Sequence, residues 1–490
     1  MRRRRLIMSA AGAVFATAAH ARAHAHGPDV NGRLGLGQAP VGVLTPDDFI
    51  GLSYECQQIA DPGFFSAEHV DLISAFKTVA RRGVLRLGGN TSEFSWWREH
   101  AADVPPFRRP TVTRPGEPAA GSLYAITPAA IDSLAAFLRA ADWRCIYGLN
   151  LGQGQPDALA REAAYVHRSL GDRLLMFAIG NEPDLFSRHL RDPATWSVEA
   201  YLSEWIPAAQ AVRRAVPDAR FSLPEVANAM DWLAAAAERV TRSGVDVPVA
   251  AMSHHFYFGG PPANPDVNIA RLLGSDPRVA AFIATATAAA RRVGARPRLT
   301  ETNTCYHGGK PGVSDVYASA LWAADLSLRL MAAEYEGIHL HGGSASAVGA
   351  SVGGLAGDAL AVGGDPRPRP YYTPIADMNG RLQLQPCAQG LRFAGLLAGA
   401  HLLPCTLEAG DLNARAYAGR QRGGGVVVAI VNKDLSRSLS VALPPHRLLA
   451  TLTGAGLESR EAKFLSAPTA PVKPGIVTVP PASAVAVLVG

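Results

Sequence analysis

The sequence predicts an α/β fold: a (β/α)8 TIM barrel followed by a C-terminal antiparallel β-sandwich domain. Between residues 46 and 399, eight short apolar runs alternate with amphipathic segments of helical period. Eight strands in such alternation favour a closed barrel over an open sheet. From residue 400 to 490 the helical period is lost, and short β-branched runs separated by Gly and Pro follow.

The expected barrel strands are short, and each is followed by a segment in which apolar residues recur every three to four positions. The strand ranges are 49–54, 84–87, 145–149, 174–179, 220–223, 251–257, 298–300 and 337–340. The helical ranges are 66–82, 128–141, 157–170, 198–215, 229–243, 267–293 and 315–334, and a last helix is expected over 386–398.

The C-terminal region reads as a β domain without chemistry of its own. Its expected strands are 414–418, 425–432, 438–443, 448–452, 476–479 and 484–489. The stretch 27–45 has no helical period and can add a strand to this domain. The Gly-, Ala- and Ser-rich stretch 342–364 lacks the strand-to-helix context of a phosphate-binding loop and is expected to be a surface loop.

The first 25 residues have the pattern of a signal peptide. Four arginines, Arg2 to Arg5, precede an apolar run over 6–19 that is too short to span a membrane, and small residues follow. Cleavage is expected after Ala23 or Ala25, and Arg3–Met8 is similar to a twin-arginine export signal. A periplasmic or secreted location follows from this prediction.

Removal of this segment changes the charge of the chain. Residues 1–23 hold five arginines and no acidic residue, so the formal net charge falls from +6 to +1. The apparent basicity gives no support to nucleic-acid binding. No later run is long and apolar enough for stable membrane insertion after cleavage. The five cysteines are odd in number and lack CxxC spacing, so no zinc site is predicted and any disulfide pairing stays open.

Unusual polar residues cluster where the predicted barrel strands end. Active sites of such barrels lie at the carboxyl ends of the strands, so these side chains are expected to share one rim. The strand ends read Ser53-Tyr54-Glu55, Gly88-Gly89-Asn90, Asn150, Gly180-Asn181-Glu182-Pro183, His254-His255-Phe256-Tyr257, Thr300-Glu301-Thr302-Asn303 and His339-Leu340-His341-Gly342.

Glu182 and Glu301 end the fourth and seventh strands, so two carboxyl groups on different strands face one pocket. Glycoside hydrolysis requires such a pair, because one acid protonates the leaving oxygen and one carboxylate attacks the anomeric carbon. Carboxyl groups about 5–5.5 Å apart predict retention of configuration, and about 6.5–9.5 Å predicts inversion. No cofactor or metal is needed for this chemistry.

The motifs around these two residues resemble those of clan A retaining glycoside hydrolases, in which Asn-Glu ends strand four and a second Glu ends strand seven. The segment Gly180–Phe186, GNEPDLF, is similar to glycoside hydrolase family 79, the β-glucuronidase and heparanase family. Three further segments are similar to the same family, and the resemblance spans about residues 46–400. They are GLSYE at 51–55, LRLGGN at 85–90 and ETNTCYHGG at 301–309.

The resemblance implies a role for each rim residue. Glu182 is the expected acid/base, and Glu301 is the expected nucleophile. Asn181 is expected to bond the sugar 2-hydroxyl and Tyr257 to orient the nucleophile, unless Tyr257 is a core aromatic. Glu55 and Asn90 are candidates for binding other sugar hydroxyls.

The resemblance also implies a glucuronide as the carbohydrate substrate, with no metal or other cofactor. Tyr306, His307 and Gly308 are expected to hold the uronate carboxylate through a phenol and backbone N–H groups. Local flexibility at Gly308-Gly309 would allow close approach of those amides. Lys310 is an alternative cation, or a solvated loop lysine. The predicted function is a retaining glycoside hydrolase that removes β-linked glucuronic acid from glycans or glycosides.

Two alternatives remain: another clan A β-glycosidase, such as a β-xylosidase or β-glucosidase, and a non-catalytic carbohydrate-binding protein. Adjacent His254 and His255 point to opposite faces of a strand, so they cannot share a metal. His339 and His341 share a face, which allows either a metal or hydrogen bonding in the pocket. Trp96-Trp97 is either a sugar-stacking platform or ordinary packing. The natural glycan, exo or endo action and the oligomeric state are not determined by the sequence.

Overall fold

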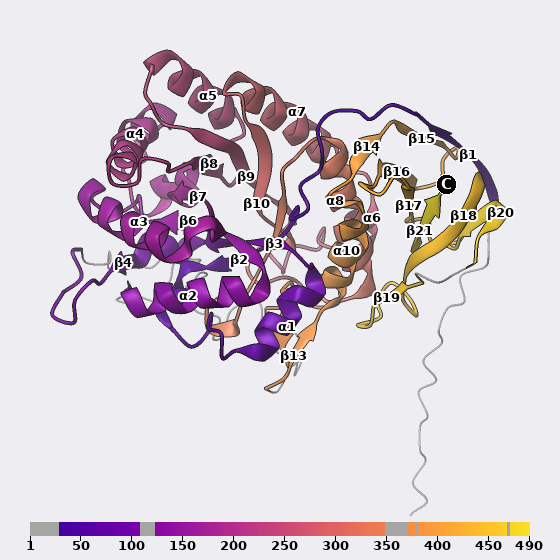
Figure 1. Cartoon of the computed structure of the whole chain (residues 1–490), viewed down its shortest axis with the longest axis horizontal. Helices are drawn as coiled ribbons and strands as arrows, with labels where there is room; N and C mark the ends of the chain where they lie inside the picture. The colour runs from indigo at the N-terminus through magenta and orange to yellow at the C-terminus, as the bar shows by residue number, and fades with distance from the viewer. Residues whose placement is uncertain (1–28, 108–122, 348–369, 379, 468–470) are drawn as a thin grey trace, which may run out of the picture.

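The computed structural model describes residues 29–107, 123–347, 370–378, 380–467 and 471–490. A barrel of strands surrounded by helices lies beside a smaller domain built of strands (Figure 1). This arrangement confirms the predicted fold class. The predicted signal peptide and most of the predicted loop over 342–364 lie outside the described residues.

Eight strands close the barrel in the order β10-β11-β2-β3-β6-β7-β8-β9, and every neighbouring pair is parallel. The strands are buried along most of their length, because helices cover the outside and inward side chains fill the interior. Each strand overlaps its predicted range. The bounds are β2 (Ile50–Glu55), β3 (Gly83–Gly88), β6 (Trp143–Leu149), β7 (Leu174–Ile179), β8 (Phe221–Val226), β9 (Val249–Gly259), β10 (Arg296–Cys305) and β11 (Ile338–Gly342).

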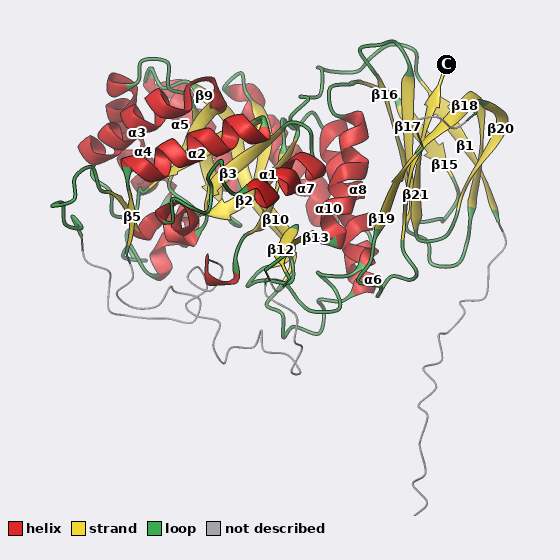
Figure 2. Ribbon diagram, turned by 60° about the horizontal axis from the view of Figure 1, so that its bottom comes forward, coloured by secondary structure: helices red, strands yellow, loops and turns green. Residues whose placement is uncertain are grey.

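Helices surround the barrel strands, as Figure 2 shows in red. Their bounds are α1 (Val70–Val79), α2 (Pro128–Ala141), α3 (Pro156–Leu170), α4 (Val198–Ala215), α5 (Asp231–Ser243), α6 (Ile269–Leu273), α7 (Pro277–Arg292), α8 (Tyr317–Ala332) and α10 (Pro386–Ala394). The prediction of one helix over 267–293 is wrong, because α6 ends at Gly274. Asp276 then caps α7 by accepting the Arg278 N–H, and Pro277 occupies the first helical position.

Two small sheets lie in the loops after barrel strands. β4 (Ser95–Trp97) pairs with β5 (Tyr124–Ile126), and β12 (Ile375–Asp377) pairs with β13 (Leu382–Leu384). The 3-10 helix η2 (Asn90–Phe94) follows β3, and the 3-10 helix η4 (Pro183–Arg188) follows β7. Both short helices carry residues of the pocket described below.

The C-terminal domain is a nine-stranded sheet with its own apolar core. The predicted strands 438–443 and 448–452 are one strand, since the chain stays extended through Pro444-Pro445 and a register shift absorbs the irregularity. β1, from the stretch 27–45, runs parallel to β18, so the pairing is mixed rather than purely antiparallel. The bounds are β1 (Val30–Leu36), β14 (His401–Leu403), β15 (Cys405–Glu408), β16 (Ala414–Arg420), β17 (Val426–Asn432), β18 (Leu439–Thr453), β19 (Lys463–Ser466), β20 (Lys473–Val479) and β21 (Ser483–Val489).

Helices α8 and α10 lie between the barrel and the β domain (Figure 2). The Tyr317 hydroxyl of α8 lies 2.9 Å from the Leu452 carbonyl oxygen and 2.7 Å from that of Ala482. Asp325 of the same helix is buried against Lys433, with 2.6 Å between Oδ2 and Nζ. Polar contacts as well as apolar packing therefore join the two parts.

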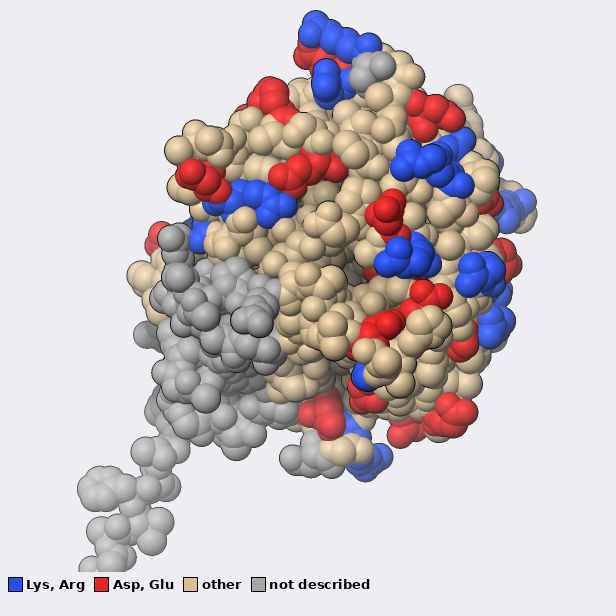
Figure 3. Space-filling view, turned by 90° about the vertical axis from the view of Figure 1, so that its left-hand side faces the viewer, with Lys and Arg blue, Asp and Glu red and all other residues tan. Residues whose placement is uncertain are grey.

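The surface carries charges of both signs. On the face of the barrel shown in Figure 3, Lys and Arg side chains are interspersed with Asp and Glu. Such mixing produces no extended field of one sign on the described part of this face. Within the described residues, no helix combines the length and apolar character needed to cross a bilayer.

Candidate active site

A cavity of about 820 Å³ opens at the carboxyl ends of the barrel strands. Its walls combine carboxylates, histidines, amides and aromatic rings from loops after different strands. The residues that line it and are used below are Glu55, Asn90, Glu93, Asn181, Glu182, Arg188, His255, Tyr257, Glu301, Tyr306, His307, His341 and Tyr372. The structure thus gathers eight of the nine predicted site residues around one cavity.

Glu301 lies within β10 and is surrounded by positive and hydrogen-bonding groups. Arg86 Nη1 donates to Oε2 at 2.8 Å, and the Tyr257 hydroxyl donates to Oε1 at 2.8 Å. His341 and His255 lie 3.7 Å and 4.0 Å from Oε2. Burial alone would raise the pKa of Glu301, but these groups outweigh it and lower the pKa to about 2. Glu301 is therefore ionised at neutral pH.

Glu182 stands at the sharp turn between β7 and η4. Its backbone is left-handed, with φ of 48°, and Pro183 begins the 3-10 helix directly after it. Burial raises the pKa of Glu182, and the negative charge of Glu301 adds to this effect. The ion pair with His255 Nδ1, 3.0 Å from Oε1, partly offsets the rise. Two carboxyl groups in one pocket thus have pKa values shifted in opposite directions, which is the pattern of an acid and a nucleophile.

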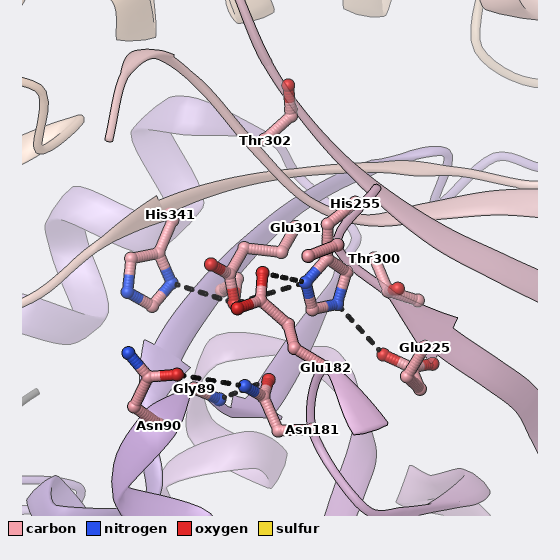
Figure 4. A network of polar contacts seen from close by, with 12 residues as sticks. Gly89, Asn90, Asn181, Glu182, Glu225, His255, Thr300, Glu301, Thr302 and His341 are labelled. Carbon is pink, nitrogen blue, oxygen red and sulfur yellow. Dashed lines mark hydrogen bonds and ion pairs between the residues drawn. The ribbon is translucent and has the colours of Figure 1, made fainter. Parts of the chain in front are cut away.

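Glu182 and Glu301 face each other across the floor of the cavity (Figure 4). One carboxylate oxygen of each lies within 4.8 Å of the other and of a His255 ring nitrogen. This close approach agrees with the carboxyl separation of about 5–5.5 Å that is typical of retaining enzymes, rather than with the roughly 6.5–9.5 Å of inverting ones. The geometry fits a double displacement.

A third carboxylate, Glu225 of β8, lies beneath this pair. Its Oε2 is 3.1 Å from Arg86 Nη2 and 3.3 Å from His255 Nε2. Burial would raise the pKa of Glu225, but His255 and Arg86 hold it well below the ordinary value. Burial would lower the pKa of His255, but Glu301, Glu182 and Glu225 raise it to about 9. His255 is therefore a cation that links all three carboxyl groups.

The sequence motifs did not predict a role for Arg86, Glu225 or His255 in the pocket. Arg86 is a charged residue in the middle of an apolar strand, and it is less than 1% exposed. Glu225 is the last residue but one of the fifth strand, which extends to Val226 rather than to the predicted residue 223. Both signals were present in the sequence: a lone arginine inside a strand pattern, and an acidic residue close to a predicted strand end.

Asn181 is held with one end of its amide fixed. Its Oδ1 accepts from Arg86 Nη2 at 2.8 Å and from the Gly89 N–H at 3.0 Å. The Nδ2 group is directed toward Asn90, 3.4 Å from its Oδ1 (Figure 4). The amide donor, rather than the acceptor, is thus presented at the pocket, which suits a bond to a sugar hydroxyl.

Glu55, at the end of β2, also lines the cavity. Thr91 donates to Oε2 through its N–H at 3.0 Å and its hydroxyl at 2.7 Å. His341 Nε2 lies 3.3 Å from Oε1, while His341 Nδ1 lies 3.0 Å from the Ser53 hydroxyl. Burial lowers the pKa of His341, but Glu301 and Glu55 raise it overall. His341 is thus placed for hydrogen bonding in the pocket.

The segment after β10 brings Tyr306 and His307 to the pocket edge. The Tyr306 ring lies edge-on to that of Tyr257, with 6.2 Å between centroids. Burial raises the pKa of Tyr306, and the Arg188 guanidinium partly offsets this rise. Arg188, at the end of η4, is therefore a second group near the phenol, one that the sequence analysis did not single out.

Gly308 does not line the cavity, contrary to its predicted place in the site. It is buried, and its carbonyl accepts the Tyr371 N–H at 2.7 Å. Gly309 has φ of +85°, and a Cβ there would lie 2.7 Å from the Tyr372 backbone nitrogen. Gly309 is thus required by the close approach of another chain segment, and binding of a carboxylate by the Gly308 N–H stays a prediction. Lys310 Nζ bonds the Asn264 carbonyl at 3.1 Å, as expected for a loop lysine.

Three open interpretations are resolved by position. His254 points away from the cavity and contacts Phe282 and the Tyr335 hydroxyl, so the two adjacent histidines do face opposite sides. His339 lies deeper in the barrel, with Nε2 3.2 Å from Arg298 Nη1, and shares no ligand with His341. Trp96 and Trp97 are not among the described residues that line the cavity; the Trp97 ring packs on that of Tyr165.

Glu182, His255 and Glu301 are the one group of the described residues whose ligand atoms are close enough to hold a cation. Arg86 already lies 2.8 Å from Glu301, and His255 is held in its charged form. Both positive charges oppose the binding of a divalent cation between the carboxylates. The donor set therefore suits acid–base chemistry better than metal binding.

No family model matches the chain. Its sequence is similar to a β-glucuronidase of Aspergillus niger, with 24% identity over 374 residues that cover 68% of this chain and 65% of the relative. It is also similar to a β-glucuronidase of Neurospora crassa, with 25% identity over 61% of this chain and 57% of the relative. The matched segments thus span less than two thirds of the length of these relatives.

Solved structures share the whole fold. A 4-O-α-L-rhamnosyl-β-D-glucuronidase from Fusarium oxysporum has a TM-score of 0.68 and 17% identity, and the match covers 94% of this chain and 100% of that one. A family 51 arabinofuranosidase from Xanthomonas axonopodis pv. citri has a TM-score of 0.66 and 15% identity over the same shares. The barrel with a trailing β domain is thus a fold found in glycosidases, and the sequence is similar to β-glucuronidases, as the motifs predicted.

Proposed function

We propose that the protein is a retaining β-glucuronidase that uses Glu301 as the nucleophile and Glu182 as the acid/base. The observation that carries this proposal is the pair itself. Two carboxyl groups, one in the turn after β7 and one within β10, have oxygens within 4.8 Å of each other. Their pKa values are shifted in opposite directions, so one proton donor and one nucleophile coexist at the same pH.

In the first step, a Glu301 oxygen attacks the anomeric carbon of the bound sugar. The bond from that carbon to the glycosidic oxygen breaks, and Glu182 gives its proton to the departing oxygen. Tyr257 and Arg86 hold the Glu301 carboxylate in place through the hydrogen bonds to Oε1 and Oε2. His255, 3.0 Å from Glu182, stabilises the carboxylate that forms there as the proton leaves.

In the second step, the Glu182 carboxylate takes a proton from water, whose oxygen attacks the same anomeric carbon. The ester bond to Glu301 breaks, and Glu301 is released as a carboxylate. Two displacements at one carbon return the sugar with its original configuration. The Nδ2 group of Asn181 is placed to donate to the 2-hydroxyl, an interaction that strengthens in the transition state.

A glucuronide is the proposed substrate because the chain is similar to two β-glucuronidases. The uronate carboxylate would lie near Tyr306 and His307, with the Arg188 guanidinium close to the same phenol. A phenol, an imidazole and a guanidinium can all donate to a carboxylate. The fold alone does not determine which sugar is bound, because structures named as arabinofuranosidases share it.

A panel of p-nitrophenyl glycosides tests the substrate. The β-glucuronide is expected to be hydrolysed with the highest kcat/KM, at least about tenfold above the β-glucoside and the β-xyloside, because only the uronate gains the charge-assisted hydrogen bonds. Equal rates on the β-glucuronide and the β-glucoside would contradict the uronate assignment and leave the glycosidase assignment intact. Sugar binding without any hydrolysis would favour a carbohydrate-binding protein instead.

A further inference from the structure

Another buried carboxylate of the pocket, Glu93, has no place in the two steps above. It lies in η2, after β3, and is 1% exposed. Its Oε1 accepts the Asn181 N–H at 2.8 Å, and its Oε2 accepts the Gly152 N–H at 2.5 Å. Ser92 donates a third hydrogen bond, to Oε1 at 3.2 Å. One side chain thus joins the loops that follow β3, β6 and β7.

The backbone that Glu93 holds is the turn that carries the acid/base. Gly180 has φ of +86° and Glu182 has φ of +48°, so Asn181 lies between two left-handed residues. Such a conformation costs free energy at Glu182, and the surroundings must therefore stabilise it. The Asn181 N–H lies in the middle of this turn, and its hydrogen bond to a buried carboxylate is a direct restraint on it.

A second contact fixes the other partner of Glu93. While the Gly152 N–H donates to Glu93, the Gly152 carbonyl accepts from Arg191 Nη1 at 2.8 Å. Arg191 lies in the loop after η4 and is itself paired with Glu204 of α4, with 2.7 Å between Nη2 and Oε2. The Gly152 peptide group to which Glu93 bonds is therefore itself fixed in place, on its other side, by Arg191.

We propose that Glu93 is a positioning residue for the acid/base. Its carboxylate holds the backbone of Asn181, and through it the side chains of Asn181 and Glu182, in the geometry needed for proton transfer and for binding the 2-hydroxyl. This proposal rests on the proposed function of Glu182. Burial raises the pKa of Glu93 to about 7, although the Gly152 and Asn181 N–H groups lower it, and only the ionised form offers both oxygens fully as acceptors.

The barrel contains a matched control in Glu162 of α3. It is also buried, burial raises its pKa to about 7 as well, and it accepts one hydrogen bond from the Tyr147 hydroxyl at 2.7 Å. Glu162 is not among the described residues that line the cavity. Changing either carboxylate to an amide therefore perturbs a buried acid in the same barrel, but only one change touches the turn of Glu182.

The test compares Glu93→Gln with Glu162→Gln. A glutamine has one acceptor, so at position 93 its amide nitrogen must face one of the two N–H groups. We expect kcat on the p-nitrophenyl β-glucuronide to fall about tenfold to a hundredfold in Glu93→Gln, with KM changed less than about threefold, because a displacement of about 1 Å can cost that much. Glu162→Gln is expected to keep kcat within about threefold, whatever its effect on thermal unfolding.

The leaving group separates positioning of the acid from general damage. A methyl β-glucuronide needs the proton from Glu182, whereas a dinitrophenyl β-glucuronide does not. The kcat/KM of Glu93→Gln, which reports the first step, should therefore fall at least about tenfold more on the methyl glycoside than on the dinitrophenyl glycoside. The kcat/KM of Glu162→Gln should change equally on both substrates. Equal losses in Glu93→Gln, or kcat within about threefold of Glu162→Gln, would overturn the proposal.

A second variant shows whether Glu93→Gln loses activity because it misfolds, and the wild-type protein shows whether the proposed function holds. Glu93→Asp keeps the charge but shortens the side chain by one methylene, so it should fold as Glu162→Gln does and lie between wild type and Glu93→Gln in kcat. If all Glu93 variants matched wild type on both substrates, the positioning role alone would be lost. If the wild-type protein hydrolysed no glycoside, the proposed function would fail first.

Discussion

The protein contains two buried clusters of charged residues, one at the interface between the barrel and the β domain and one in the pocket, and they are built from similar residue types. The interface cluster joins Asp325 of α8 to Arg415, Tyr417 and Lys433 of the β domain, and Asp325 and Lys433 are each 5% exposed. The pocket cluster consists of Arg86, Glu182, Glu225, His255 and Glu301. Each contains a carboxylate that accepts one phenol hydrogen bond of 2.8 Å and lies beside a guanidinium.

The two clusters differ in the ratio of their charges. At the interface, one carboxylate meets two cations, and burial is outweighed so that the pKa of Asp325 lies below its ordinary value. In the pocket, three carboxyl groups contact one arginine and one histidine, His341 contacts only Glu301 of the three, and the pKa of Glu182 is raised. An excess of carboxyl groups over cations favours one protonated carboxyl group, whereas an excess of cations keeps a single carboxylate ionised. Because Glu182 also lines the cavity, its proton can be transferred to a bound substrate.

The largest expected effect comes from exchanging one carboxylate for an amide in each cluster. Glu301→Gln removes the nucleophile, so kcat should fall by at least about 10³-fold. The unfolding free energy should fall only modestly, because the lost ion pair with Arg86 is offset by Glu225, which still contacts both Arg86 and His255. Asp325→Asn should keep kcat per folded molecule and lower the unfolding free energy by about 3–5 kcal/mol, since Lys433 is left buried and unpaired. Steady-state kinetics measures kcat, and urea unfolding measures the unfolding free energy, for each variant.

The interface change should also alter the pH dependence of stability. The folded pKa of Asp325 is depressed, so its contribution is present above the ordinary value of 3.8 and is lost as the pH falls through the folded pKa. Asp325→Asn should flatten that part of the acid unfolding curve. The charge comparison fails if Asp325→Asn abolishes hydrolysis, or if Glu301→Gln lowers stability as much as Asp325→Asn does.

The second effect concerns the raised pKa of Glu182. This group must be protonated in the proposed first step, so its ionisation should lower kcat/KM as the pH rises through its pKa. Glu301, with a pKa of about 2, is ionised throughout the working range and sets no limb above that value. Glu182→Gln should lower kcat/KM by about 10²–10⁴-fold on substrates with poor leaving groups and remove the alkaline limb.

Rate measurements across pH 4–10 on a dinitrophenyl and a methyl β-glucuronide check this prediction. The dinitrophenyl substrate should lose little kcat/KM in Glu182→Gln, because its leaving group departs without protonation. An alkaline limb that persists unchanged in the variant would belong to another group, with His255, whose pKa is about 9, as the first candidate.

The sequence predicts those pocket residues that directly follow a strand pattern along the chain. Glu182 and Glu301 directly follow apolar strand patterns, so the barrel architecture alone placed them on one rim. Arg86 and its partners could not be paired in this way. Arg86 and Glu301 are 215 positions apart, and Arg86 and Glu225 are 139 apart. Periodicity assigns a residue to the interior face but not to a neighbour across the barrel.

Other misses have different physical origins. Glu93 follows a strand by several residues and lies in a short 3-10 helix, where no periodic pattern indicates its direction. The close approach of Tyr372 to Gly309 comes from a distant segment, which no local pattern in the sequence indicates. The interface cluster was invisible because the sequence does not specify which barrel helix packs on the β domain.

The smallest expected effect compares the two phenols, because each donates to a buried carboxylate at 2.8 Å. Tyr257→Phe removes a hydrogen bond that lowers the pKa of Glu301, yet Arg86 and the histidines still keep that group ionised. The nucleophile should be less well oriented, and kcat should fall about tenfold to a hundredfold, with little change in unfolding free energy. Tyr417→Phe should lower the unfolding free energy by about 1.5–3 kcal/mol and leave kcat unchanged. If both variants affected only stability, Tyr257 would be a core aromatic, and the difference between the clusters would lie in their carboxylates alone.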